Sequence, residues 1–218
     1  MDKLSPEMIQ LFITEFGNQF VSAAKKNRLD SFRRLNPHAT KKGISFIGDS
    51  ITEGFPIHEM YSGEMPVYNR GVGGDTTSEL LQKLRETVYE LEPSIVVLLI
   101  GVNDLAFSSD VNEISGRIKQ ICQAIMASQP DIRLIVQSVY PINPMYDPRV
   151  TQFILGSRTN VSILELNKRI QAITTDVGGQ EHIPIEVANL AAFLFYRYKF
   201  LSQAKDKNLY RLPELTRT

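Results

Sequence analysis

The chain has 218 residues, of which 43% are hydrophobic and 22% charged, and these fractions are typical of a globular protein rather than a disordered one. Its 24 Lys and Arg residues balance 24 Asp and Glu residues, so the chain has no net charge. It therefore lacks the overall positive charge that would favour binding to nucleic acid. The length indicates one domain with an extension. We place an N-terminal helix and linker at 1–42 and the main domain at 43–218.

Three sequence features bear on location and cross-linking. The first six residues lack the apolar run of a signal peptide, which predicts a cytoplasmic protein. The longest apolar stretch, 183–201, contains Glu, Arg and Lys, whereas a membrane span needs about 20 apolar residues, so we expect no span. Cys122 is the only cysteine, which excludes an internal disulfide or a multi-cysteine metal site. Its isoleucine neighbours predict a buried place on a helix.

In chain order, the first predicted element is a helix at 6–24, where apolar side chains recur at helical spacing. A basic, polar linker is predicted at 25–42. Short apolar runs then alternate with amphipathic helical patterns, which predicts an α/β fold with a parallel sheet covered on both faces. The predicted strands are 44–47, 67–69, 95–100, 134–139 and 183–187, and the predicted helices lie around 80–88, 111–125 and 161–173.

Unusual residues follow three of the predicted strands. In an open α/β sheet, ligands bind at the carboxyl ends of the strands, where these segments meet. We therefore expect the three segments to lie along one edge of the sheet. They are Gly48-Asp49-Ser50 after the first strand, 69–77 after the second, and Gly101-Val102-Asn103-Asp104 after the third.

Ser50 is the candidate nucleophile, because it opens a helix whose dipole and free amides favour developing negative charge. The alternative is purely structural. Glu53 follows Ser50 by three residues, as in a capping box, so Ser50 could simply cap its helix.

Gly74 and Asn103 are the candidate donors. The Gly73-Gly74 pair lets the backbone approach a ligand and present an amide, although an ordinary turn capped by Thr76 and Glu79 would account for the same residues. Asn103 ends the most buried strand, where an unpaired carboxamide would cost about 1 to 3 kcal/mol. It therefore needs a partner or a function. Acyl transfer requires a nucleophile and such donors, and the three segments together supply that set.

These segments resemble the SGNH (GDSL) hydrolase family over roughly residues 43–173, and look closest to its platelet-activating-factor acetylhydrolase branch. The resemblance implies a three-layer, flavodoxin-like sandwich and no cofactor. It also implies that Ser50 is the nucleophile, and that the oxyanion hole consists of the amides of Ser50 and Gly74 and the side chain of Asn103. Thr52 stands where the Gly-x-Ser-x-Gly elbow of α/β-hydrolases has its second glycine, so that elbow is excluded.

One family block, an Asp-x-x-His that supplies the general base, is absent. None of the three histidines belongs to such a block, since His38 lies in the linker, His58 lies beyond the Ser50 helix, and His182 precedes the last predicted strand. His58 could still swing toward Ser50. The ending at 213–218 resembles the stretch that precedes the missing block in family members. We therefore expect a C-terminus that is truncated or altered relative to an active ancestor.

Three functions remain open. The first is hydrolysis of a small-molecule or lipid-like ester through an acyl-enzyme, with acetyl as the family-level acyl group. The second is a module that binds acylated ligands without turnover. The third is metal-dependent phosphoester chemistry on Asp49, Asp75 and Asp104, although each could instead begin a helix. The aromatic run at 193–200, if exposed, would favour an oligomer.

Overall fold

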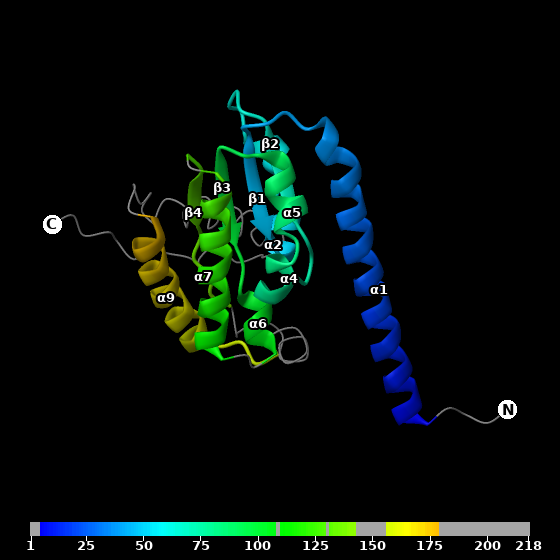
Figure 1. The fold of residues 1–218 in the computed structure, drawn as a ribbon. Helices are drawn as coiled ribbons and strands as arrows, with labels where there is room; N and C mark the ends of the chain where they lie inside the picture. Colours follow the sequence, from blue (N-terminus) through cyan, green and yellow to red (C-terminus); the bar gives the residue numbers. More distant parts are fainter. Residues whose placement is uncertain (1–4, 108–109, 130, 143–155, 179–218) are drawn as a thin grey trace, which may run out of the picture. The chain divides into compact units, whose positions relative to one another are not determined.

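The computed structural model describes residues 5–107, 110–129, 131–142 and 156–178 (Figure 1). Contacts divide the chain into two compact units, 1–182 and 183–218. The second unit lies outside the described residues, and so do the strand predicted at 183–187 and the apolar stretch 183–201. Among the described helices, none is long and apolar enough to cross a membrane.

The sheet contains four parallel strands in the order β2-β1-β3-β4 (Figure 1). This arrangement confirms the predicted α/β fold. The strand register places Gly48, the last residue of β1, opposite Gly71 of β2 and Leu99 of β3. The three candidate segments therefore leave the sheet at the same edge, as predicted. The strands are β1 at Ile44–Gly48, β2 at Val67–Gly71, β3 at Ile95–Leu99 and β4 at Arg133–Val136.

Helices follow the strands and bury their apolar stripes against the sheet. The long helix α7 lies beside α9 and also contacts α4 (Figure 1). Besides α1, the described helices are α2 at Ser50–Glu53, α3 at Ile57–Met60, α4 at Thr77–Leu81, α5 at Leu84–Thr87, α6 at Val102–Ala106, α7 at Val111–Ser128 and α9 at Asn160–Gly178, with 3₁₀ turns η1 at Asn36–His38 and η2 at Tyr89–Leu91. The helix predicted around 80–88 is thus two short helices, interrupted at Gln82 and Lys83.

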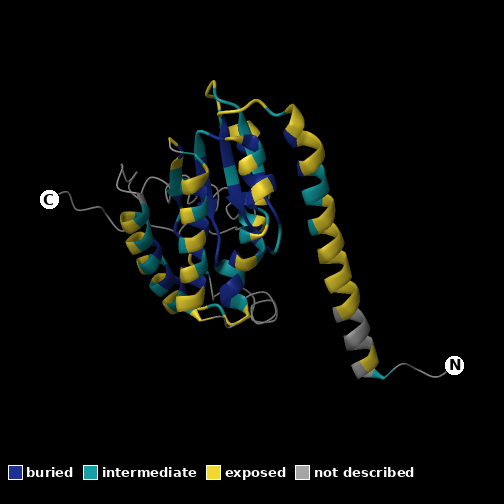
Figure 2. Ribbon diagram, in the orientation of Figure 1, coloured by how far each residue is buried: buried dark blue, intermediate teal, exposed yellow. Residues whose placement is uncertain are grey.

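The hydrophobic core lies between the sheet and these helices. Val96 and Leu98 of β3 are fully buried and pack with Ile114 and Ile118 of α7. Cys122 is 1% exposed within the same core, which confirms its predicted place. Figure 2 shows the outcome of this amphipathic pattern, with buried strands and helices whose outer faces are exposed.

Helix α1 spans Pro6–Leu35, so the segment 25–35 is helical and the predicted start of a linker at Lys25 was wrong. Several cationic side chains of this segment contact the rest of the protein. Arg33 pairs with Glu86 at 2.9 Å, and the buried Phe32 ring lies under the guanidinium groups of Arg28 and Arg70. Ion pairs and cation–π contacts attach this segment to the rest of the protein. Its sequence therefore does not show the regular spacing of apolar residues by which a helix is recognised.

Candidate active site

Ser50 is the first residue of α2 and is exposed. The helix is capped by its neighbour, since Asp49 Oδ1 accepts a hydrogen bond from the Ile51 amide at 2.9 Å. Glu53 does not complete a capping box with Ser50, because its Oε2 accepts from the Gly73 amide at 2.5 Å. The structural alternative for Ser50 was therefore wrong. Its hydroxyl is not used as a cap.

The loop between β2 and α4 lies against Ser50. A Cβ atom placed on Gly73 would lie 3.9 Å from the Ser50 Cβ and 3.0 Å from Glu53 Oε2, so a side chain at position 73 would fill this contact. Gly74 has a φ of +76°, which glycine adopts without strain. The amide of Gly74 donates to no other described residue. Thr76 and Glu79 form the predicted capping box of α4, which leaves the two glycines uninvolved in capping.

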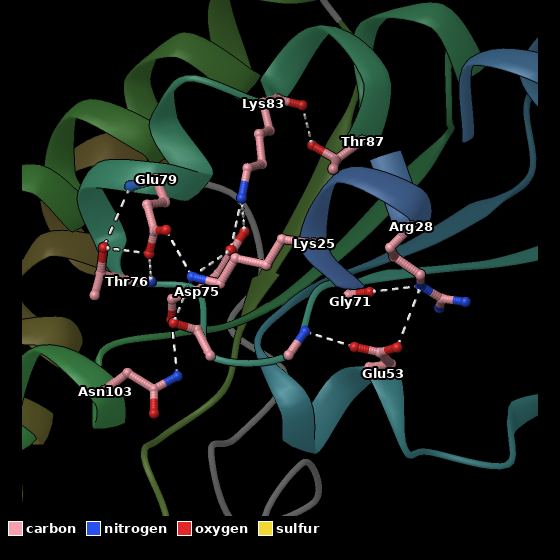
Figure 3. A network of polar contacts seen from close by, with 12 residues as sticks. Lys25, Arg28, Glu53, Gly71, Asp75, Thr76, Glu79, Lys83, Thr87 and Asn103 are labelled. Atoms are coloured by element: carbon pink, nitrogen blue, oxygen red, sulfur yellow. Dashed lines mark hydrogen bonds and ion pairs between the residues drawn. The ribbon is translucent and has the colours of Figure 1, made fainter. Parts of the chain in front are cut away.

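Asn103 lies in the first turn of α6 and is hydrogen-bonded at both ends of its carboxamide. Its Nδ2 donates to the Asp75 carbonyl at 2.9 Å, and its Oδ1 accepts from Arg158 Nη2 at 2.9 Å. The carboxamide thus has the partners that its position requires, and its second Nδ2 hydrogen has no partner among the described residues. The Gly73–Asp75 stretch touches Ser50 on one side and Asn103 on the other, and Figure 3 shows Asn103 bonded to this loop.

Asp104, the neighbour of Asn103, joins the second and third loops. Its carboxylate is buried and accepts from the Thr77 amide at 2.9 Å and from the Thr77 hydroxyl at 2.5 Å. Arg117 of α7 lies 3.3 Å from the same carboxylate. The start of α4 is therefore bonded to α6, which fixes the Gly73–Asp75 stretch relative to Asn103.

A pocket of about 310 Å³ opens above Ser50. Residues of α2 and of the β2–α4 loop form one side, and residues of α1 form the other. The volume is at the lower end of the range for small-molecule sites. Its lining consists of Ser50, Glu53, Val72, Gly73 and Gly74 on one side and Phe20, Val21, Ala24, Lys25 and Arg28 on the other.

Residues 46–183 match the model of the GDSL-like lipase/acylhydrolase family. The chain belongs to this family. The match spans the three candidate segments and the whole described sheet except for the first two residues of β1.

Known members and structures agree with that assignment. The chain is 28% identical over 140 residues to the platelet-activating factor acetylhydrolase IB subunit alpha2 of Homo sapiens and of Bos taurus, which covers 62% of this chain and 60% of theirs. It thus spans less than two thirds of these relatives' length. A Streptococcus pneumonia protein named for platelet activating factor superimposes with a TM-score of 0.73 at 26% identity, over 80% of this chain and 81% of that one. A GDSL-like lipase from Bacteroides thetaiotaomicron gives 0.55 at 26% identity, over 68% and 75%.

In this GDSL-family chain, a buried carboxylate lies directly beside Ser50. Burial raises the pKa of Asp49 to about 6, although the Ile51 amide and the charge of Arg158 act in the opposite direction. Its Oδ2 is buried and has no hydrogen-bond partner among the described residues. The buried, ionised Asp49 carboxylate therefore destabilises the folded state, directly beside the candidate nucleophile.

The two other aspartates of the metal hypothesis have protein partners. Both Asp75 oxygens accept from Lys83 Nζ, at 2.6 and 2.7 Å, and burial raises the pKa of Asp75 against the effect of this lysine. Asp104 is bonded to Thr77 and Arg117, as described above. Within the described ranges, no group of three or more His, Cys, Asp or Glu side chains is arranged to hold a metal ion. The contacts of these carboxylates give the metal hypothesis no support.

The two described histidines are not part of this pocket. His38 in η1 and His58 in α3 are exposed and line an adjoining groove of about 650 Å³ beside β2, which shares Arg28 and Glu53 with the Ser50 pocket. Neither is among the residues that line the Ser50 pocket. His182 and the ending at 213–218 lie outside the described residues.

Sequence reasoning missed three residues of this site. Arg158 bonds to Asn103 from 55 positions away, and Lys25 and Arg28 reach the β2–α4 loop from α1. No local pattern marks these contacts, because each joins segments far apart in the chain. A clue for α1 existed in the spacing of Lys25, Arg28 and Phe32, which places the three side chains on one face of a helix.

Proposed function

We propose that this chain is a serine ester hydrolase that acts through an acyl-enzyme on Ser50. The observation that carries the proposal is the position of the Gly73-Gly74 segment against Ser50, whose hydroxyl is not used in capping. An exposed serine at a helix start, beside an amide without a partner among the described residues, is suited to forming and stabilising an oxyanion intermediate.

In the proposed reaction, Ser50 Oγ attacks the carbonyl carbon of the ester. The amides of Ser50 and Gly74 and the free Nδ2 hydrogen of Asn103 donate to the oxyanion that forms. The Ser50 proton passes to a general base and from it to the departing alkoxide as the ester C–O bond breaks. Water hydrolyses the acyl-Ser50 ester and releases the carboxylic acid.

The proposed substrate is a small or lipid-like ester with a short acyl group. A pocket of about 310 Å³ bounded by Phe20, Val21 and Val72 is apolar on these sides, which favours an uncharged acyl chain. The relatives named platelet-activating factor acetylhydrolase support acetyl as the acyl group to test first.

Ester hydrolysis tests the proposal. We expect the wild-type protein to hydrolyse p-nitrophenyl acetate, and Ser50→Ala to lower kcat by about a thousandfold or more, because the nucleophile is lost. Ser62→Ala, which changes an exposed serine outside the pocket, is the matched control and should leave the rate unchanged. Equal rates for the wild type and Ser50→Ala would refute a role for Ser50.

A second candidate function is binding of acylated ligands without turnover. It is favoured by one observation: neither described histidine lines the Ser50 pocket. In that case glyceryl triacetate should give saturable heats of binding in calorimetry, with equal affinity for the wild type and Ser50→Ala, and no acetate should be released. Release of acetate by the wild type alone would exclude this candidate.

A further inference from the structure

Two cations of α1 bind the backbone of the β2–α4 loop. Lys25 Nζ donates to the Gly74 carbonyl at 3.0 Å, and Arg28 Nε donates to the Gly71 carbonyl at 3.0 Å (Figure 3). The two contacts lie at either end of the segment that carries the proposed oxyanion donor. Helix α1 therefore contacts the loop at both ends of this segment.

The same cations are also paired with acidic side chains. Lys25 Nζ lies 2.6 Å from Glu79 Oε1 and 3.3 Å from Asp75 Oδ1. Arg28 Nε lies 3.7 Å from Glu53 Oε1, while the other Glu53 oxygen accepts from the Gly73 amide. The side chain of Lys25 is 18% exposed and that of Arg28 31%, so water screens both less than it screens surface pairs.

These contacts fix all but one peptide group of the loop. The peptide group between Gly71 and Val72 is held by Arg28 and by the bond from the Val72 amide to Gly48. The peptide group between Val72 and Gly73 is held because the Gly73 amide donates to the Glu53 carboxylate and the Val72 carbonyl accepts from the Asp75 amide. The peptide group after Gly74 is held by Lys25 and by the Asp75 amide's bond to that same Val72 carbonyl.

The exception is the peptide group between Gly73 and Gly74, which carries the proposed donor. It makes no hydrogen bond to a described residue, yet fixed peptide groups precede and follow it. Its orientation is therefore set without use of its own N–H. A side chain at position 74 would meet Lys25, since a Cβ there would lie 3.4 Å from Lys25 Cε.

We propose that Lys25 and Arg28 are positioning residues that hold the Gly71–Asp75 segment so that the Gly74 amide faces the oxyanion formed at Ser50. Helix α1 lies outside the residues that match the family model, 46–183, and in this chain it completes the site. The inference rests on the proposed function of Ser50. Neither cation needs to touch the substrate to act in this way.

Kinetics of single variants test the inference. Lys25→Met and Arg28→Met should each lower kcat for p-nitrophenyl acetate about 10- to 100-fold with little change in KM, since a misplaced oxyanion donor weakens the transition state more than the ground state. Lys25→Arg, which can still donate to the Gly74 carbonyl, should restore much of kcat. Lys26→Met removes an adjacent, exposed lysine and should not change kcat. Wild-type kcat in both methionine variants would overturn the inference.

A second measurement, made without substrate, separates this inference from the proposed function. Hydrogen exchange of the amides in 71–75 should be faster in Lys25→Met and Arg28→Met than in the wild type and Lys26→Met, with unchanged exchange in α7 showing that the variants are folded. If the wild type fails to hydrolyse esters, the function fails while exchange still reports on the loop. Exchange equal to that of the wild type in both variants would overturn the positioning role.

Discussion

At the scale of single residues, hydrogen bonds between segments far apart in the chain determine how the candidate residues are placed. The segments with Ser50, Gly74 and Asn103 lie at one edge of the sheet, because parallel strands end there together. A capping box with Ser50 was one alternative for Glu53, and the structure instead bonds Glu53 to Gly73. That choice between a local and a distant partner is decided by packing, which a sequence pattern does not contain.

Asp49 carries a prediction about stability and pH. Its pKa is about 6 in the folded protein, above the ordinary value of 3.8, so the folded state holds the proton more tightly. The contribution of Asp49 to the free energy of unfolding therefore falls as the pH rises from about 4 to 6. Asp49→Asn should remove this fall. Its free energy of unfolding, relative to that of the wild type, should therefore rise by up to about 3 kcal/mol between pH 4 and pH 8.

Urea unfolding of the two proteins at pH 4, 6 and 8 measures this difference. Asp131→Asn, at an exposed carboxylate, is the control and should run parallel to the wild type across the series. If the free energy of unfolding of Asp49→Asn had the same pH dependence as that of the wild type, the charge of Asp49 would not destabilise the fold.

At the scale of elements, strands and apolar helices were predictable and polar helices were not. The strand runs were found because buried parallel strands are continuously apolar. The stripe on α7 was found because its isoleucines recur at helical spacing. Residues 25–35 of α1 lack such a stripe and were predicted as a linker. Their helix is stabilised by cations that reach distant carboxylates and carbonyls, and those partners are not visible in a local window.

At the scale of the whole molecule, the single thiol reports on the described core. Burial raises the pKa of Cys122 to about 12, and this residue of α7 is 1% exposed within the hydrophobic core. We expect Ellman's reagent at pH 8 to react with the native protein only as fast as the core opens, and at once in urea. Because the chain has no other cysteine, the signal has one source. Reaction of the native protein at the rate of the unfolded one would contradict the burial of Cys122.

The buried Asp104 carboxylate also bears on how the site responds to change elsewhere in the chain. Its bonds to Thr77 tie the segment with Gly74 to the helix with Asn103. Separating the two would break hydrogen bonds to a buried charge, each worth about 1.5 to 3 kcal/mol. The start of α4 should therefore keep its distance from Asn103 in Lys25→Met and Arg28→Met, so that those variants change the orientation of the Gly74 amide and not the placement of α4.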